Sequence, residues 1–189
     1  MNQEELDKFE NRTWITRTSR IHAEKRLLNK EKFIQWINIY YSCITIFLSI
    51  YTLVRPNERF SLLTVFVTIS LSLSITYLNS QRYPDQAREF RNNYTEIMKL
   101  EYRAKHIDTE CELEKLEEEY CDLLNLNNNH ISYDYYCTVH EAKCSKSSDS
   151  KTRWKDIRIK YYWGVIWRFL IKIVMIILPI VILLICGVK

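Results

Sequence analysis

The sequence predicts an all-α membrane protein, with a transmembrane helical hairpin, cytosolic helices and a third transmembrane helix at the C-terminal end. The 189 residues include only two glycines and three prolines, too few for the turns of a β-barrel or the glycine-rich loops of a nucleotide-binding sheet. Three apolar blocks alternate with strongly charged segments. Two of these blocks are long enough, without a single charge, to cross a bilayer.

Residues 1–32 are predicted to form a basic cytosolic helix that continues into the first span. The segment from Glu4 to Lys32 contains no proline or glycine, and its apolar residues recur at weak helical spacing. Its charges either set only the topology of the chain or also bind anionic lipid, to which each Lys or Arg near the surface adds about 1 kcal/mol.

Residues 33–78 are predicted to form the transmembrane hairpin, from uncharged blocks at 33–54 and 60–78. The blocks hold 22 and 19 residues, and a bilayer core needs about 20. The connection between them is short and contains Pro56, which cannot continue a helix. Two spans joined so closely must run antiparallel.

Residues 161–189 are predicted to form a third span, with an interfacial or re-entrant helix, or a tail packed on the hairpin, as the alternatives. The uncharged run here, 173–188, has only 16 residues, and Pro179 predicts a kink. Two tryptophans mark a membrane interface, and two basic side chains could reach the headgroups and extend the span. These four residues are Trp163, Trp167, Arg168 and Lys172.

The distribution of positive charge predicts that both ends of the hairpin lie in the cytoplasm. Basic residues cluster before the first span and after the second, whereas the turn offers only Arg55 and Arg59. A third span would then place the C-terminus outside. The cysteines of the polar segments would lie in a reducing compartment as free thiols: Cys111, Cys121, Cys137 and Cys144.

Residues 79–160 are predicted to form a cytosolic helical region with a loop. Pro84 stands where a helix begins. An apolar stripe follows at intervals of three, four and three residues: Ala87, Phe90, Tyr94 and Ile97. The stripe is too narrow to build a core alone, so it needs a partner helix from the same chain or from another copy. We expect Phe90, Tyr94 and Ile97 to contact a second copy in a homo-oligomer.

A second helix of this region is predicted to begin near Asp108-Thr109, because Glu112 completes a capping box. One face of this helix is apolar. The remainder is strongly acidic, and either faces solvent or pairs with the basic N-terminal segment. Exposed ion pairs contribute about 0–1 kcal/mol each, so such pairing would guide register. The apolar positions are Leu113, Leu116, Tyr120 and Leu123.

Residues 127–151 are predicted to be loop-like, because asparagines open the segment and serines close it. Cys137, His140 and Cys144, with His130 as a fourth ligand, could bind zinc, but their spacing matches no standard zinc module. We favour reduced, structural side chains at these positions.

The sequence contains no motif of an enzyme or of a cofactor site. It has no glycine-rich phosphate loop, no HExxH, no CxxC pair and no nucleophile in a recognisable context. We therefore predict a non-enzymatic protein without a cofactor. The net charge of +4 is modest, and we predict no direct nucleic-acid binding.

Each span of the hairpin carries a polar stripe at helical spacing. Either the two stripes face each other and pack the hairpin, or one of them lines a water-filled path in an oligomer, because a single hairpin cannot enclose a pore. We take the second-span stripe as the candidate pore lining: Ser61, Thr64, Thr68, Ser72 and Thr76. The alternative stripe, on the first span, is Gln35, Asn38, Ser42, Thr45, Ser49 and Thr52.

The order of several short segments resembles a known family. A basic run precedes a span that contains Trp36, a Ser/Thr-rich span follows, and Tyr83-Pro84 opens the cytosolic region. The later segments are Glu119-Tyr120-x-x-Leu123-Leu124, Asn129-His130 and Tyr133-Asp134-Tyr135. Over residues 12–136 this order resembles the SLATT family, the two-span effector domains of bacterial anti-phage defence systems, and the block from Tyr161 extends beyond the resemblance.

The resemblance implies a multi-pass protein of the bacterial inner membrane that oligomerises, opens the bilayer and causes abortive infection. It also implies a sensor partner, either a nucleotide-signalling enzyme or a reverse-transcriptase system. The alternative is a membrane anchor that recruits a cytosolic partner through its helices. A pore-forming effector should depolarise cells, whereas an anchor should not.

Overall fold

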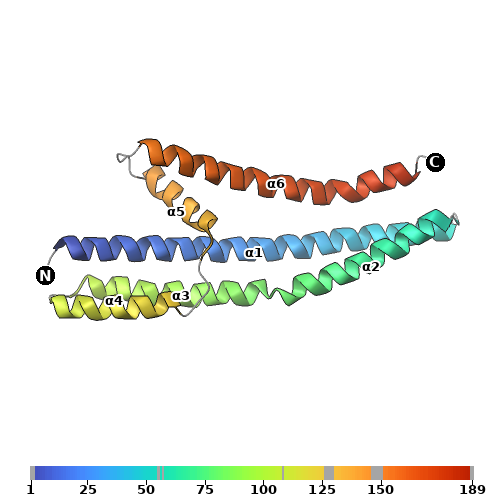
Figure 1. Ribbon diagram of the computed structural model, residues 1–189. Coiled ribbons are helices and arrows are strands. Elements are labelled where there is room, and N and C mark those ends of the chain that lie inside the picture. The colour runs from blue at the N-terminus through green and yellow to red at the C-terminus, as the bar shows by residue number, and fades with distance from the viewer. Residues whose placement is uncertain are drawn as a thin grey trace. The chain divides into compact units, whose positions relative to one another are not determined.

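The computed structural model describes residues 3–54, 56, 58–107, 109–125, 130–145 and 151–187. These residues form six α-helices (Figure 1) and no strand, which confirms the all-α fold class. The helices are α1 (Gln3–Val54), α2 (Glu58–Ser80), α3 (Tyr83–Ala104), α4 (Glu110–Asn125), α5 (Ser132–Ser145) and α6 (Lys151–Gly187).

The chain divides into two compact units. The first, here called the polar unit, comprises residues 1–28 and 84–165, and the second, the apolar unit, comprises residues 29–83 and 166–189. The predicted continuation of the N-terminal helix into the first span is confirmed, because α1 has no break between Gln3 and Val54.

The junction between α2 and α3 is tight. Arg82 adopts a left-handed backbone conformation with φ of 46°, and the Gln81 amide donates to the Leu78 carbonyl at 3.3 Å. The next helix begins at Tyr83, with Pro84 in its first turn, where the missing N–H of proline costs no hydrogen bond. The predicted helix start is therefore confirmed.

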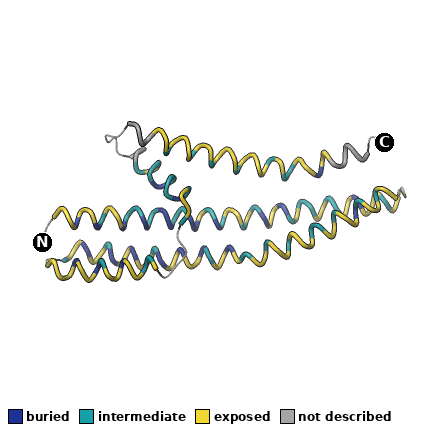
Figure 2. Tube along the Cα trace, viewed as in Figure 1, coloured by how far each residue is buried: buried dark blue, intermediate teal, exposed yellow. Residues whose placement is uncertain are grey.

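The core of the polar unit is formed by one face each of α1, α3 and α4 (Figure 2). The predicted stripe of α4 lies in this core, where Tyr120 meets Phe9 edge-to-face at 6.0 Å between ring centroids. The buried members are Leu6, Phe9, Ile97, Leu100, Ala104, Leu113, Leu116 and Tyr120.

The stripe of α3 is mostly covered within the single chain. Phe90 and Ile97 are buried and Tyr94 is half-buried. A partner for the narrow stripe is supplied within the same chain, because Ile97 packs in the core with residues of α1 and α4. Contact of Phe90, Tyr94 and Ile97 with a second copy stays a prediction.

The predicted start of α4 is confirmed, and Thr109 and Glu112 form one half of the predicted capping box; Asp108 lies outside the described residues. The backbone amide and the hydroxyl of Thr109 both donate to Glu112 Oε2, at 3.3 and 2.9 Å. The acidic face of α4 is mostly exposed. It forms one ion pair with the N-terminal segment, between Arg12 and Glu117.

The predicted loop over residues 127–151 is wrong for residues 132–145, which form α5. The backbone amide of Ile131 donates to Asp134 Oδ2 at 3.2 Å, and this contact caps the helix. Among the residues of α5 with described side chains, 132–142, the fully buried ones are Asp134 and Thr138. Both are polar, so no buried apolar stripe marks this helix in the sequence.

The structure gives the zinc alternative no support. The His140 ring stacks on Tyr161, with centroids 4.4 Å apart, and the Cys137 side chain is half-buried. Among the residues with described side chains, which exclude Cys144, no group of three His, Cys, Asp or Glu gathers as metal ligands.

Candidate functional site

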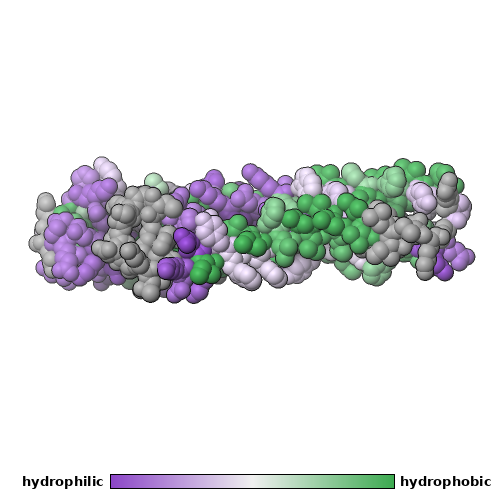
Figure 3. Space-filling view, turned by 90° about the horizontal axis from the view of Figure 1, so that it is seen from above, coloured by the Kyte–Doolittle hydropathy of each residue, from purple (hydrophilic) through white to green (hydrophobic). Residues whose placement is uncertain are grey.

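The apolar unit presents its hydrophobic side chains outward. Three helices in the described part of the chain are long and apolar enough to cross a membrane, within α1, within α2 and over residues 155–181 of α6. Hydrophobic side chains gather on the face of this unit that Figure 3 shows. Leu53 is 82% and Phe66 is 70% exposed. A surface this apolar requires lipid or further protein around it.

The second-span stripe lies mostly on the outer surface of α2. Thr64 is buried, whereas the remaining four positions, Ser61, Thr68, Ser72 and Thr76, are exposed. The inner surface of α2 is instead largely apolar, with half-buried Leu63, Val67, Leu71 and Ile75. The stripe is therefore available to another helix or to water, and the hairpin packs mainly through apolar residues.

The hydroxyls of this stripe bond to their own helix. Thr64, Thr68, Ser72 and Thr76 each donate to the carbonyl oxygen four residues earlier, at 2.8 to 3.0 Å. This contact lets a hydroxyl lie in an apolar environment without an unsatisfied donor.

The first-span stripe runs along the edge between the covered and open surfaces of α1. Asn38, Thr45 and Thr52 are half-buried, and Gln35, Ser42 and Ser49 are exposed. The covered face is apolar, with Ile34, Ile37 and Leu48. This stripe is therefore less open than the second-span stripe.

Two tyrosines of α1 hold α6 within the apolar unit. Pro179 has no N–H, so the carbonyl of Met175, four residues earlier, loses its helical hydrogen bond. The Tyr41 hydroxyl donates to the Met175 oxygen at 2.8 Å, and the Tyr40 hydroxyl donates to the neighbouring Ile176 oxygen at 3.0 Å. This contact was not predicted from the sequence. The features that could have indicated it are the two tyrosines in the middle of the first span and the proline in the third apolar block.

In the polar unit, α1 presents a polar face to its neighbours. The Thr16 and Tyr120 hydroxyls are 2.6 Å apart, and those of Ser19 and Thr138 are 3.0 Å apart. The Arg91 guanidinium donates to Glu24 Oε1, with Nε at 2.7 Å. The sequence predicted solvent, lipid or the acidic helix as the surroundings of these charges. Part of the segment is instead a buried polar interface, which the sequence did not predict.

Arg26 and Asp134 form the most buried ion pair of this interface. Arg26 Nε and Nη2 donate to the two carboxylate oxygens at 2.9 and 3.0 Å. The Asp134 carboxylate is fully buried. Such a bidentate pair fixes α5 on α1 in one orientation.

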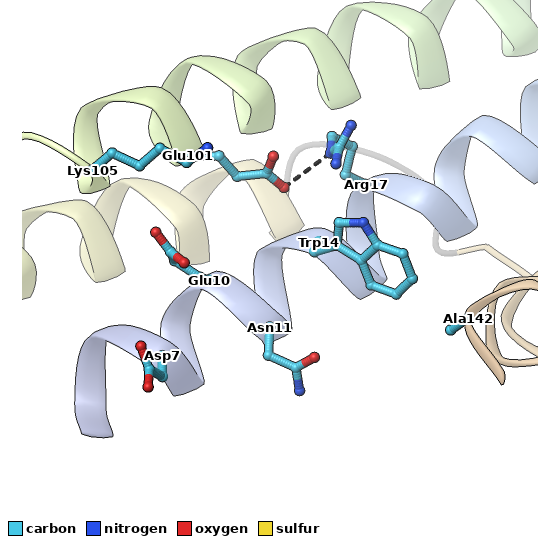
Figure 4. Close-up of a pocket in the computed structure, with 8 residues that line it drawn as sticks. All are labelled: Asp7, Glu10, Asn11, Trp14, Arg17, Glu101, Lys105 and Ala142. Atoms are coloured by element: carbon cyan, nitrogen blue, oxygen red, sulfur yellow. Dashed lines mark hydrogen bonds and ion pairs between the residues drawn. The ribbon is translucent and has the colours of Figure 1, made fainter. Parts of the chain in front are cut away.

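An open groove of about 490 Å³ is lined by residues of α1, α3 and α5 (Figure 4). Arg17 Nε donates to Glu101 Oε1 at 3.0 Å within it. Burial raises the pKa of Glu101 above its usual range, although Arg17 acts in the opposite direction. The mixed charges of the lining favour no single ligand class: Asp7, Glu10, Asn11, Trp14, Arg17, Glu101, Lys105 and Ala142.

Comparison with known proteins identifies a family. The model of the SMODS and SLOG-associating 2TM effector domain family 5 matches residues 2–185. The match includes the third apolar block, which the resemblance over residues 12–136 left outside. Neither a curated protein nor a solved structure matches the chain significantly.

Proposed function

The chain belongs to the SLATT family of two-span membrane effector domains, and we propose that it oligomerises in the bacterial inner membrane and opens a path for ions across it. A sensor partner, either a nucleotide-signalling enzyme or a reverse-transcriptase system, would trigger the opening, and loss of the membrane potential would arrest the infected cell. The observation that carries this proposal is the outward position of the hydroxyl stripe on α2.

An outward stripe needs more than one copy of the chain to form a path. One hairpin cannot surround water, but several copies can place their α2 stripes around a common axis. The apolar surface beside the stripe would then face lipid or neighbouring copies. Hydroxyl oxygens would replace part of the hydration shell of a passing ion.

We expect Thr68→Leu combined with Ser72→Leu to abolish depolarisation while leaving expression and insertion intact. Leucine makes the span more apolar, so insertion should if anything improve, and a path lined by leucine dewets. The measurement is membrane potential in cells that express the protein with its neighbouring genes, together with the amount of assembled protein.

Leu71→Ile and Leu73→Ile are the matched controls, off the stripe, and should change little. If the stripe only packs helices, the leucine variants should instead lower the amount of protein and of oligomer together. Full depolarisation by the double variant would remove α2 as the lining and make the first-span stripe the next candidate. If the wild-type protein never depolarises cells, the result would support the alternative function, a membrane anchor that recruits a cytosolic partner.

The proposed topology places the N-terminus and both ends of the hairpin in the cytoplasm. A reporter that is active only in the periplasm should be active when fused after Asn57 and silent when fused after Gln81. A fusion after Lys189 should be active, because the third span carries the chain outward. Activity after Gln81 would contradict the cytoplasmic position of the polar unit.

A further inference from the structure

A cation without a counter-ion lies within the third predicted span. Lys172 of α6 is exposed, and its ammonium lies 5.1 Å from the centre of the Phe33 ring of α1. Among the described residues, Lys172 forms no hydrogen bond or ion pair. An aromatic face attracts a cation, but it leaves the three N–H groups of the ammonium without an oxygen acceptor. An unpaired charge is costly in a membrane segment, so Lys172 needs an anionic partner.

The contact with Phe33 places this ammonium where the first span begins. Phe33 is the first residue of the uncharged block of α1. One turn earlier, the Lys30 ammonium lies 4.3 Å from the centre of the Tyr83 ring, at the other end of the hairpin. Lysine brings its charge to the headgroups by extending a long apolar stem to the boundary of an apolar block. Lys172 and Lys30 therefore mark one headgroup level of the apolar unit.

This end of the apolar unit carries an excess of positive charge. Residues 29–36, 80–83 and 166–172 contain five cations and one carboxylate, that of Glu31. Glu31 accepts a hydrogen bond from the uncharged amide of Gln35 at 2.9 Å, so this contact leaves the cations without a counter-ion. The five cations are Lys30, Lys32, Arg82, Arg168 and Lys172.

Trp36 provides a second donor beside Lys172. Its ring is 49% exposed and stacks with Phe33 and Tyr40, with centroids 6.4 and 5.5 Å away. Its indole N–H has no hydrogen-bond partner in the described part of the chain. The Tyr40 hydroxyl donates to the Ile176 carbonyl, which holds this row of rings beside α6. Phe33 thus contacts both Trp36 and Lys172, two groups that lack an acceptor.

We propose that Lys172 and Trp36 form a binding site for an anionic phospholipid, with the headgroup phosphate as the group that they bind. Its oxygens accept hydrogen bonds from both residues and supply the missing negative charge. A lipid fits better than a soluble phosphate, because the surface farther along both helices is apolar and can contact acyl chains, with Ile39 and Val174 exposed. The ammonium of a zwitterionic headgroup would add to the positive excess. The proposal requires a bilayer around the apolar unit and is independent of the proposed ion path.

The test measures which lipids surround Trp36. The full chain, with Trp14, Trp154, Trp163 and Trp167 replaced by phenylalanine, is reconstituted in phosphatidylcholine vesicles. These contain a small fraction of either brominated phosphatidylglycerol or brominated phosphatidylcholine, whose bromine quenches the fluorescence of a neighbouring indole. We expect brominated phosphatidylglycerol to quench as strongly as an about fivefold higher fraction of brominated phosphatidylcholine, the preference that one basic side chain supplies at a membrane surface.

Lys172→Gln should abolish this preference, whereas Lys172→Arg keeps the charge and should retain it. Arg59→Gln is the matched control, because Arg59 begins α2 at the opposite end of the hairpin; it should change nothing. Equal quenching by the two brominated lipids, or an unchanged preference in Lys172→Gln, would overturn the proposal. An equal loss in Arg59→Gln would show a general effect of charge and would overturn it as well. Competition by soluble glycerol phosphate would overturn the lipid as the ligand.

The chain with all its tryptophans gives a second measurement. Native mass spectrometry of the detergent-solubilised protein, mixed with equal amounts of phosphatidylglycerol and phosphatidylcholine, should show an excess of bound phosphatidylglycerol. Lys172→Gln should bind the two lipids equally, and equal binding by the wild type would overturn the proposal. A protein that keeps the lipid preference but never depolarises cells would contradict the ion path alone, so the two proposals can fail separately.

Discussion

Replacing Arg26 with methionine is expected to destabilise the polar unit by about 3–5 kcal/mol, because it leaves a carboxylate buried without its counter-ion. The Asp134 side chain has no exposed surface, and both of its oxygens accept hydrogen bonds from Arg26. Detergent-solubilised chain should lose hydrogen-exchange protection first in α5, which this pair attaches to α1. Chemical unfolding of the same sample gives the free energy.

The exposed pair between Arg12 and Glu117 provides the matched control. It joins the same helix, α1, to another helix of the unit, but both side chains are about half exposed. Glu117→Gln should therefore change the free energy of unfolding by less than about 1 kcal/mol. If Arg26→Met proved as mild as Glu117→Gln, Asp134 would have to be neutral in the folded chain and the pair would not be ionic.

Tyr41→Phe is expected to weaken the attachment of α6 in the apolar unit by about 1–2 kcal/mol, because it leaves the Met175 carbonyl without a donor. The hydroxyl is the group that replaces the amide that Pro179 lacks. Unfolding of the purified chain in micelles, followed by the fluorescence of Trp163 and Trp167, measures the loss.

A double-mutant cycle with Pro179→Ala distinguishes this explanation from a general effect of the tyrosine. Alanine restores the backbone N–H, so Met175 regains its helical partner and Tyr41→Phe should then cost little. Ser42→Ala, at the next position, removes a hydroxyl that donates to its own helix and should have a small effect in both backgrounds. An equal loss with and without Pro179 would contradict the role of the freed carbonyl.

The helices with a strong local signal were predictable. Uncharged blocks of bilayer length predicted α2 and the apolar half of α1, and Thr109 with Glu112 predicted the start of α4. Helix α5 was not predictable in this way. Asp134 and Thr138, which are fully buried, are polar. They contact Arg26 and Ser19, more than a hundred positions away in the sequence.

In the candidate site, too, features within one helix were predictable and features that depend on contacts between helices were not. A periodic stripe of hydroxyls can be seen in one helix alone, so the second-span residues were identified from spacing. The side to which the stripe points depends on which face its neighbours cover. The buried ion pairs of the polar unit gave no sequence signal, because one arginine in a basic segment is indistinguishable from its neighbours until the structure shows that Arg26 pairs with Asp134 and Arg91 with Glu24.

The bonding of the α2 hydroxyls to their own helix has a consequence for ion selectivity. Each hydroxyl hydrogen is committed to a backbone carbonyl, so the oxygen lone pairs are what remains free on the outer surface. A ring of such oxygens would act on an ion as a ring of carbonyl dipoles does, with the negative end toward the ion. A path lined by Thr68, Ser72 and Thr76 would therefore favour cations and repel chloride, without any charged residue in its wall.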